Sequence, residues 1–413
     1  MMRCTKTVLW LGLALLAPVA WAQTDYDLAK LESLALHSSR AVLAGRSAVD
    51  AARAAVDTAA AFPNPELEYM SGSQRARGVG GNLGDARSVA LTQPLDMPWV
   101  RSSRIGAAEA GLEATSAANR GFEAEVLARL RLRYYEVLRR EAEQRNARED
   151  LASMESVRSR IALRVETGEA ARFELIKADT ELLNAQKAAQ VAGFRVEQAR
   201  SLLRQAVGNE LPVSFTLAGR LSNVPDLPPI EILRKEVEAE SPDLARARAE
   251  LVRAERQLDL EKRQRWPNLA VKASMDEDPD VRANKVGVVM SIPLWNRRSG
   301  PVGEAAAHLT RARYELEAQQ FSQQKQLEVA YQQYEIAQAQ VNALESGIVR
   351  QAEEALKIAA AAYRFGERGF IEVLDAQRVY RAARVELIAA RYELAAAWVE
   401  IERLRATPGG KQQ

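Results

Sequence analysis

The feature that most restricts what this chain can fold into is a helical periodicity that continues for tens of residues. Apolar and small residues recur at alternating three- and four-residue spacings, which is the pattern of a coiled-coil seam. In the second half of the chain these series are Ala330, Tyr334, Ala337, Val341, Leu344 and Ile348, and Leu387, Ala390, Leu394, Ala397, Ile401 and Leu404. In the first half they are Leu127, Leu130, Tyr134 and Val137, and Met154, Val157, Ile161 and Val165. The pattern predicts a mainly α protein of long, closely packed coiled-coil helices.

Two clusters of proline and aromatic residues interrupt this pattern. Phe62-Pro63-Asn64-Pro65 ends the first helical stretch, and Trp266-Pro267-Asn268 ends a later one. After each cluster, apolar and polar residues alternate with a period of two, as in a strand with one apolar face. The alternation predicts four β-strands in two hairpins, with these bounds: 64–95 with its loop at 71–85, and 267–294 with its loop at 276–284.

The two halves of the chain also resemble each other. Gly168-Glu169 followed by Glu174-Leu175-Ile176 matches Gly366-Glu367 followed by Glu372-Val373-Leu374, at an offset of about 198 residues. The order helix, hairpin, long helix, glycine turn, helix therefore occurs twice. The expected units are a signal peptide at 1–22, a first repeat at 23–207, a linker or equatorial segment at 208–229, a second repeat at 230–405 and a disordered tail at 406–413.

The first 22 residues read as a secretory signal. Arg3 and Lys6 precede an apolar run from Val8 to Val19, and Ala20-Trp21-Ala22 supplies a small-x-small cleavage site. The single cysteine, Cys4, lies before that run, so we expect no lipid anchor and no thiol in the exported chain. Disulfides, thiolate metal sites and cysteine nucleophiles are then excluded together.

Composition excludes several other functions. Without Arg3 and Lys6, 55 of the 57 basic residues remain against 55 acidic ones, which argues against nucleic-acid binding. His37 and His308 each lack a second ligand-type residue at metal spacing, so no metal site or cofactor is expected. The glycine-rich stretch from Gly78 to Gly84 lies between strands and is not a nucleotide site. The sequence shows no nucleophile–base pair, no metal cluster and no phosphate-binding loop, so we expect no enzymatic activity.

The lengths of the predicted elements suggest a duct. The helix from about Val302 to Tyr363 would be on the order of 90–100 Å long, and its counterpart from about Val100 to Val165 is similar. After residue 22 no apolar stretch could cross a membrane as a helix, so a crossing would need strands. Four strands cannot close a barrel, whereas a trimer would supply twelve.

Aromatic residues fall at the four corners between helix and strand, and they are Phe62, Trp99, Trp266 and Trp295. We expect them to lie at one membrane boundary as an interfacial girdle. The alternative is that they are ordinary core aromatics at the corners of a domain.

These features resemble the TolC family of outer-membrane factors. The doubled unit, the Gln93-Pro94-Leu95 and Ile292-Pro293-Leu294 corners, and the stretch Tyr363-Arg364-Phe365-Gly366 leading into Glu372-Val373-Leu374-Asp375-Ala376 carry the likeness. It covers nearly the whole exported chain and is closest to the CzcC/CusC-like heavy-metal efflux branch. One departure is that many members of that branch are lipoproteins, and this chain lacks the required cysteine.

The resemblance implies a homotrimer in the outer membrane, with a twelve-stranded barrel and an α-helical periplasmic tunnel. It implies a periplasmic adaptor and an inner-membrane RND pump as partners, and passive export of solutes, with heavy-metal cations as a candidate cargo. The resemblance also implies tunnel-aperture carboxylates at Glu372 and Asp375 and a gate latch of Tyr363, Arg368 and Glu174. The turns at Gly168, Glu169, Gly366 and Glu367 are exposed candidates for adaptor docking. The alternatives are a solvated, charged helix face for the carboxylates and ordinary turn residues at the glycines.

Two other functions remain open at the level of sequence. The same duct would serve a type I protein secretion system, because the pump selects the cargo. A periplasmic coiled-coil adaptor or structural rod is a different class, in which the strands would form a small soluble domain.

Overall fold

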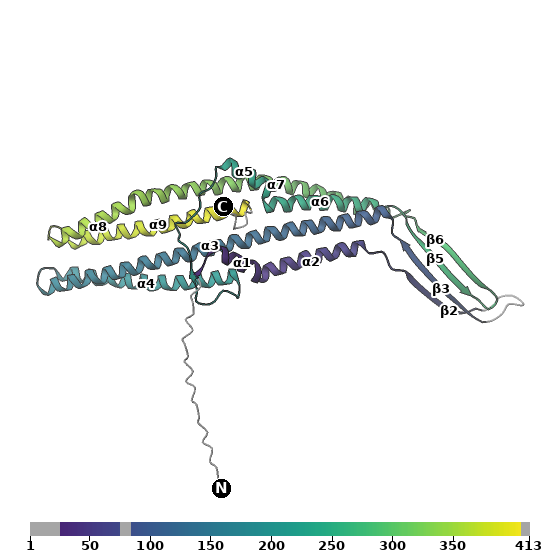
Figure 1. Ribbon diagram of the computed structural model, residues 1–413, viewed down its shortest axis with the longest axis horizontal. Helices are drawn as coiled ribbons and strands as arrows, with labels where there is room; N and C mark the ends of the chain where they lie inside the picture. The colour runs from purple at the N-terminus through teal and green to yellow at the C-terminus, as the bar shows by residue number, and fades with distance from the viewer. Residues whose placement is uncertain (1–24, 75–83, 406–413) are drawn as a thin grey trace, which may run out of the picture.

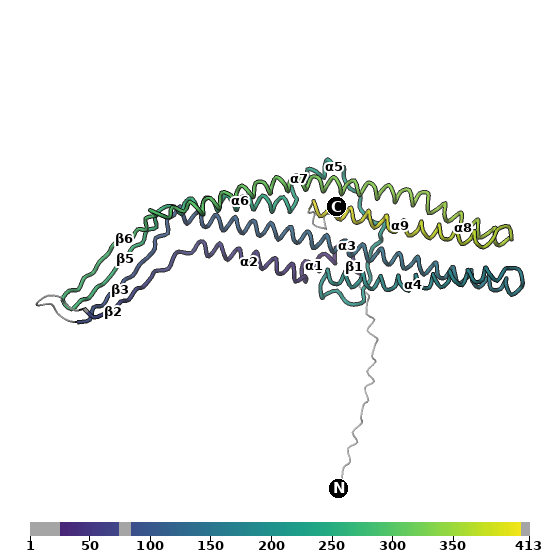
Figure 2. Tube along the Cα trace, turned by 180° about the vertical axis from the view of Figure 1, so that it is seen from behind, coloured from purple at the N-terminus to yellow at the C-terminus, as the bar shows by residue number. Residues whose placement is uncertain are grey.

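The computed structural model describes residues 25–74 and 84–405. The expected signal peptide and C-terminal tail lie outside these residues. Helices form one long curved layer, and a four-stranded sheet continues from one end of it (Figures 1 and 2). The mainly α fold with a β portion is thus confirmed.

The two repeats contain equivalent elements in the same order. The first has α1 (Leu28–Ser38), α2 (Arg40–Ala60), β2 (Glu66–Gln74), β3 (Gly84–Leu95), α3 (Pro98–Glu166) and α4 (Arg172–Val207). The second has α5 (Ile230–Glu240), α6 (Pro242–Arg263), β5 (Asn268–Glu277), β6 (Arg282–Ser291), α7 (Ser299–Ala343), the π-helix η1 (Leu344–Ile348), α8 (Val349–Arg364) and α9 (Phe370–Arg405). The 69 residues of α3 make a helix about 100 Å long.

The sheet is antiparallel, and its strand order is β2-β3-β5-β6. Helices α2, α3, α6 and α7 adjoin these strands and pack as neighbours in the same order. Both hairpin loops are shorter than expected, because strand pairing continues to Gln74↔Gly84 and to Glu277↔Arg282. The alternation of apolar residues fades before the backbone ladder ends, so the sequence pattern underestimated the strands.

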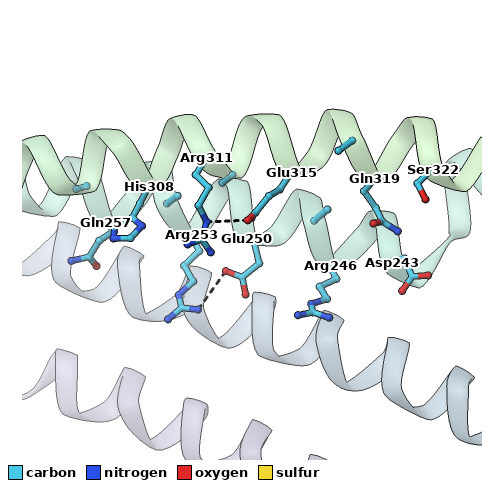
Figure 3. Close-up of a pocket in the computed structure, with 15 residues that line it drawn as sticks. Asp243, Arg246, Glu250, Arg253, Gln257, His308, Arg311, Glu315, Gln319 and Ser322 are labelled. Carbon is cyan, nitrogen blue, oxygen red and sulfur yellow. Dashed lines mark hydrogen bonds and ion pairs between the residues drawn. The ribbon is translucent and has the colours of Figure 1, made fainter.

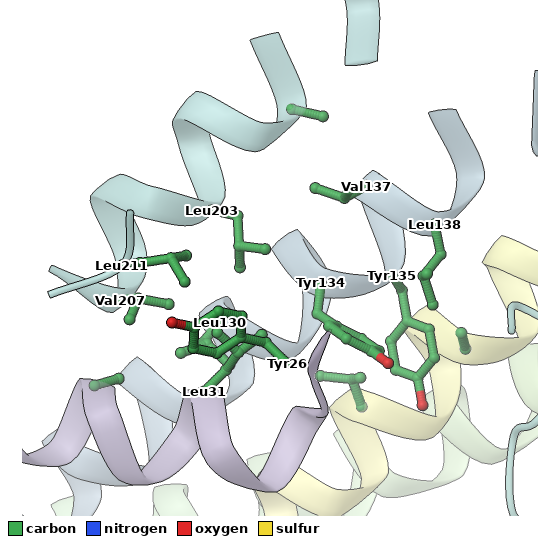
Figure 4. Close-up of a cluster of buried hydrophobic side chains, with 14 of the residues drawn as sticks. Tyr26, Leu31, Leu130, Tyr134, Tyr135, Val137, Leu138, Leu203, Val207 and Leu211 are labelled. Carbon is green, nitrogen blue, oxygen red and sulfur yellow. The ribbon is translucent and has the colours of Figure 1, made fainter. Parts of the chain in front are cut away.

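The largest cluster of buried residues lies at the middle of the molecule. Tyr26, Leu31, Leu130, Tyr134 and Leu203 belong to it (Figure 4). The short strands β1 (Asp25–Tyr26) and β4 (Thr216–Leu217) pair in parallel beside this cluster. This pairing, which ties the start of the first repeat to the 208–229 linker, was not predicted, because two-residue strands carry no periodic signal.

Each short helix breaks off from its neighbour at a serine. Ser39 separates α1 from α2, and Ser241 separates α5 from α6, both with extended ψ angles near 120°. Ser241 accepts a hydrogen bond from the backbone N–H of Leu244, and Pro242 occupies the first helical position, which favours a new helix start. The two breaks are a further property that the repeats share.

The π-helix changes the seam of the second long helix. Leu344 is buried as expected, but Ile348 is 49% exposed, which contradicts its predicted place in the seam. A π-turn accommodates one extra residue, so the buried face shifts and returns at Ala352, eight residues after Leu344. Among the described residues, no helix combines the length and the hydropathy that a membrane-spanning helix requires.

Candidate functional site

One face of the four-stranded sheet is apolar and exposed. Residues that stand opposite each other in the ladder point to the same face. One such row is Leu67, Leu91, Ala273 and Val286, and another is Leu95, Leu269 and Met290. Val286 is 81% exposed, and Leu67, Leu91 and Met290 are exposed as well. A strip of apolar side chains without a covering element therefore extends across the sheet.

The opposite face carries a ladder of polar contacts. Glu68 accepts a hydrogen bond from Lys272 Nζ at 2.8 Å, reaching across Ala90, which is the small buried residue between them. Asp276 accepts from Ser88 Oγ at 2.6 Å and from Lys285 Nζ at 2.9 Å. Each strand alternates between the two faces, so the sheet separates an apolar side from a polar side that carries charges of both signs.

The sequence predicted the alternation of apolar and polar residues in these strands. It did not predict the contacts among the polar side chains, because they join residues of different strands. Val289, which interrupts the alternation in sequence, lies on the polar face opposite Ala270, near the helix end of the sheet. Met70, opposite Ser88, is a second exposed apolar side chain on the polar face.

The four predicted aromatic residues all lie where helices meet strands. The rings of Trp99 and Trp266 form an edge-to-face pair with centroids 6.4 Å apart. Phe62 packs under Arg101, whose guanidinium carbon is 4.5 Å from the ring centroid. Trp295 is 94% exposed. All four residues are exposed, from Trp99 at 43% upward, which is unlike ordinary core aromatics.

Arginines near Asp96 fix the end of α2. Asp96, whose side chain is only 6% exposed, pairs with Arg104 and lies 3.9 Å from Arg101 Nε. Arg104 Nε donates to the carbonyl of Ala59 and Arg101 Nη2 donates to that of Ala60, which satisfies the last carbonyls of the helix. Ion pairs and hydrogen bonds therefore join the helix layer to the sheet at this corner.

A second polar cluster holds the corner on the side of α6. Asp259 accepts from Ser103 Oγ at 2.8 Å and pairs with Arg263. The Ser103 hydrogen bond and then Arg263 lower the pKa of Asp259 below its usual value. Glu261 pairs with Arg298, a residue in the left-handed region with φ of 55° that begins α7.

The far end of the helix layer consists of two equivalent glycine turns. Gly168 and Gly366 both have φ of 76°, a conformation that side chains strongly disfavour. The backbone N–H of Glu169 donates to Arg164 at 2.8 Å, and that of Glu367 donates to Ala362 at 2.9 Å. These are the hydrogen bonds of a Schellman motif, and they leave Glu169 and Glu367 exposed at the tips.

The predicted latch residues are brought together only in part. Tyr363 on α8 donates its hydroxyl to Glu174 Oε2 on α4 at 3.0 Å, although the two are 189 positions apart. Burial and then the Glu174 hydrogen bond raise the pKa of Tyr363. Arg368 does not contact this pair, and its Nη1 lies 3.0 Å from Glu372 Oε2 instead.

The predicted aperture residues lie on the first two turns of α9. Glu372 and Asp375 are exposed and line a groove of about 680 Å³ with Lys177, Glu181 and Arg378. Arg378 pairs with Glu181 across this groove. Asp375 has no ion pair or hydrogen bond of its side chain among the described residues. Two carboxylates of α9 thus share one face of the tip, as their spacing predicts.

A larger groove of about 940 Å³ lies between α6 and α7, with alanines at its floor. Figure 3 shows two ion pairs in this groove, each within one helix: Arg253 with Glu250 and Arg311 with Glu315. His308, at one end, lies 3.7 Å from Glu304 on its own helix. Within the residues that the structure describes, no group of three or more histidine, cysteine or acidic residues could hold a metal ion.

Comparisons with known proteins agree with this architecture. The family model of the outer membrane efflux protein matches residues 31–209 and 233–407. The chain is 26% identical to the cobalt-zinc-cadmium resistance protein CzcC of Cupriavidus metallidurans, over 90% of this chain and 88% of that protein. It is also 26% identical to the outer membrane protein TolC of Escherichia coli, over 52% of this chain and 47% of that protein.

Solved structures share the fold. The structure of CusC superposes with a TM-score of 0.77 at 17% identity and covers 95% of both chains. The open-state MtrE outer membrane channel of Neisseria gonorrhoeae gives a TM-score of 0.76 at 18% identity, over 92% of this chain and 88% of that one. With the family model matching most of its length in two repeats, this chain belongs to the outer membrane efflux protein family, the TolC-like channels of the outer membrane.

Proposed function

We propose that three copies of this chain form the exit duct of a tripartite efflux system, together with a periplasmic adaptor and an inner-membrane RND-type pump. The observation that carries the proposal is the amphipathic sheet with two unpaired edges at the end of a long helix layer. The membership of the family supplies the outer-membrane channel. The assembly and the partners are what the proposal adds.

The edges of the sheet support the trimer. β2 and β6 each pair on one side only in the described sheet. An open edge in lipid leaves backbone groups unpaired, at a cost of several kcal/mol each, and four strands are too few to close. Three copies give about twelve strands, with the apolar face towards lipid and the polar ladder of Glu68, Lys272 and Asp276 towards water.

The helix layer also has apolar side chains that nothing in one copy covers. On α4 they include Phe173, Leu183 and Phe194, and on α7 they include Tyr314, Phe321 and Val329. These two helices lie at opposite edges of the layer (Figure 1). Exposed apolar strips of this kind mark interfaces, and a neighbouring copy would cover both.

The tips of the helices are the proposed inner aperture. Glu372 and Asp375 would become rings of carboxylates under three-fold symmetry, which favours cations. The hydrogen bond from Tyr363 on α8 to Glu174 on α4 joins the two helical hairpins, α3–α4 and α8–α9, and is the proposed latch. Glu169 and Glu367, with their glycine turns, are the proposed contacts with the adaptor.

Metal cations are the proposed cargo. A relative that matches 90% of this chain is named for resistance to cobalt, zinc and cadmium, whereas TolC of Escherichia coli matches 52%. Carboxylates at the tip suit cations better than a secreted polypeptide of mixed charge. Type I secretion remains the alternative, and no observation on the structure favours it.

The trimer and its lipid-facing surface can be tested in one set of variants. We expect the detergent-solubilised protein to have the mass of three chains and to produce conductance steps in planar bilayers. Val288→Lys, on the apolar face, should lower assembly, because a charge facing the bilayer midplane costs about 2–4 kcal/mol. Thr92→Lys, on the polar face, is the matched control and should assemble normally.

A monomeric protein without conductance would overturn the proposed duct. If Thr92→Lys were the harmful change and Val288→Lys the harmless one, the assignment of the two faces would be reversed.

A further inference from the structure

The corners between the helix layer and the sheet hold an excess of positive charge. The segments 95–104, 258–266 and 291–298 contain seven basic and three acidic residues, a net charge of +4, although the chain as a whole is nearly neutral. The acidic residues are Asp96, Asp259 and Glu261, and each is already paired. The excess positive charge therefore comes from the basic side chains that these acidic residues do not pair with.

Three of the basic side chains at the corners have no partner in the structure. Arg101, Arg104, Arg263 and Arg298 pair with the three acidic residues. Lys262, Arg265 and Arg297 are exposed, and within the described residues their side chains make no ion pair or hydrogen bond. They are free to bind an anion from outside the chain.

These three residues lie close in sequence to the end of the apolar face. Lys262 and Arg265 are four residues and one residue before the exposed Trp266, and Arg297 is two residues after the exposed Trp295. The last apolar row of the sheet, Leu95, Leu269 and Met290, is only a few residues away on the same strands. Lipid acyl chains that cover this face would place their headgroups at the level of the tryptophans and the free cations.

We propose that Lys262, Arg265 and Arg297 bind the phosphate groups of anionic phospholipids at the periplasmic boundary of the membrane. The inference rests on the proposed function, because it needs the sheet to lie in a bilayer. Guanidinium groups bind phosphate oxygens in pairs of hydrogen bonds, and an ammonium binds them as a point charge. These three residues, with Trp266 and Trp295, form what we call the cationic belt. The belt would fix how deeply the sheet lies in the membrane and would favour acidic lipids.

The tryptophans of the belt allow a direct measurement. The protein is reconstituted in phosphatidylcholine vesicles containing brominated phosphatidylglycerol or brominated phosphatidylcholine, and quenching of tryptophan fluorescence gives the relative affinity of the two lipids. We expect the wild type to prefer phosphatidylglycerol at least tenfold, because each basic side chain near an acidic headgroup contributes about fivefold (about 1 kcal/mol). The preference should fall at 1 M salt, where the screening length is about 3 Å.

The decisive variant carries Lys262→Gln, Arg265→Gln and Arg297→Gln and should lose the preference. The matched control carries Lys187→Gln, Arg195→Gln and Arg350→Gln and should keep the preference. It removes three charges from α4 and α8 that also have no partner within the described part of the chain. Added glycerol phosphate should not compete at millimolar concentration; displacement by it would show a site for soluble phosphate instead of lipid.

Single-channel conductance is measured on all three proteins. A conducting wild type without lipid preference, or a triple variant that retains the preference, overturns this inference and leaves the duct intact. A wild type that neither conducts nor enters vesicles overturns the proposed function itself.

Discussion

Tyr363 connects the helical hairpin α8–α9 to the helical hairpin α3–α4, because both its ring and its hydroxyl make contacts. Its ring lies 5.7 Å from that of Phe370 and under the guanidinium of Arg164, and its hydroxyl donates to Glu174. The pKa of Tyr363 is raised above that of a free tyrosine, so the folded state binds its proton more tightly than the unfolded state does. This tighter binding of the proton adds to the free energy of unfolding. The added stability is fully present below about pH 10, and it is lost as the pH rises through the raised pKa.

Tyr363→Phe removes this hydroxyl and keeps the ring. A hydrogen bond to a charged acceptor contributes about 1.5–3 kcal/mol, so the open probability of the channel should rise roughly tenfold or more. Single-channel recording in planar bilayers measures this leak. Tyr380→Phe, at a tyrosine of α9 whose hydroxyl makes no hydrogen bond within the described residues, is the control. Equal closed times in Tyr363→Phe and wild type would remove the latch.

Sequence reasoning identified these tip residues by type and position but not by pairing. Tyr363 and Glu174 were grouped with Arg368, and the hydrogen bond joins only the first two. Arg368 is four residues from Glu372 across the start of α9, and a local ion pair of that spacing forms without tertiary guidance. Which pairs form at the tip depends on how four helices meet, and no single stretch of sequence contains that information.

At the scale of elements, the glycine turns show how closely the two repeats agree. Gly168 and Gly366 have the same φ and close the same Schellman hydrogen bonds. The repeats differ at the long helix, where α3 is continuous and its counterpart contains η1. Periodicity predicted the helices and the turns, but it could not predict the π-turn, because one inserted residue changes the seam only after the insertion.

Gly366→Ala should destabilise the protein. A left-handed backbone costs a residue with a Cβ atom about 1–2 kcal/mol, although open space surrounds the added atom. Gly168→Ala should have the same effect, since the turns are equivalent. Gly106→Ala, within α3 and also in open space, is the control and should be neutral or slightly stabilising. Thermal unfolding followed by circular dichroism measures all three; equal melting temperatures for Gly366→Ala and Gly106→Ala would contradict the strain.

At the scale of the whole molecule, the carboxylates at the helix tip could select ions only in the proposed trimer. In one copy, Glu372 and Asp375 are two exposed side chains on a helix face. Their proposed role as a selectivity ring needs three copies around an axis. The sequence indicated the carboxylates and the strands that require closure, but the ring itself is a property of the symmetric assembly.

Replacing both carboxylates, as Glu372→Gln with Asp375→Asn, should lower the permeability ratio of cations to anions severalfold and weaken block by divalent cations. Reversal potentials under a salt gradient measure the ratio. Glu386→Gln with Glu393→Gln removes the same charge farther along α9 and should change it less. If both double variants gave the wild-type reversal potential, the aperture would lie elsewhere.

Each strand of the sheet leads into one helix of the layer, and both sets keep the same lateral order. Adjacent strands are about 4.8 Å apart, whereas packed helices are about 8–10 Å apart. A wall with a constant circumference therefore requires the strands to run obliquely, so that each takes up more of the perimeter. The ion pairs of Asp96 with Arg104 and of Glu261 with Arg298 lie where the spacing changes. In the proposed trimer, the tilt of the strands at this level would set the diameter of the barrel.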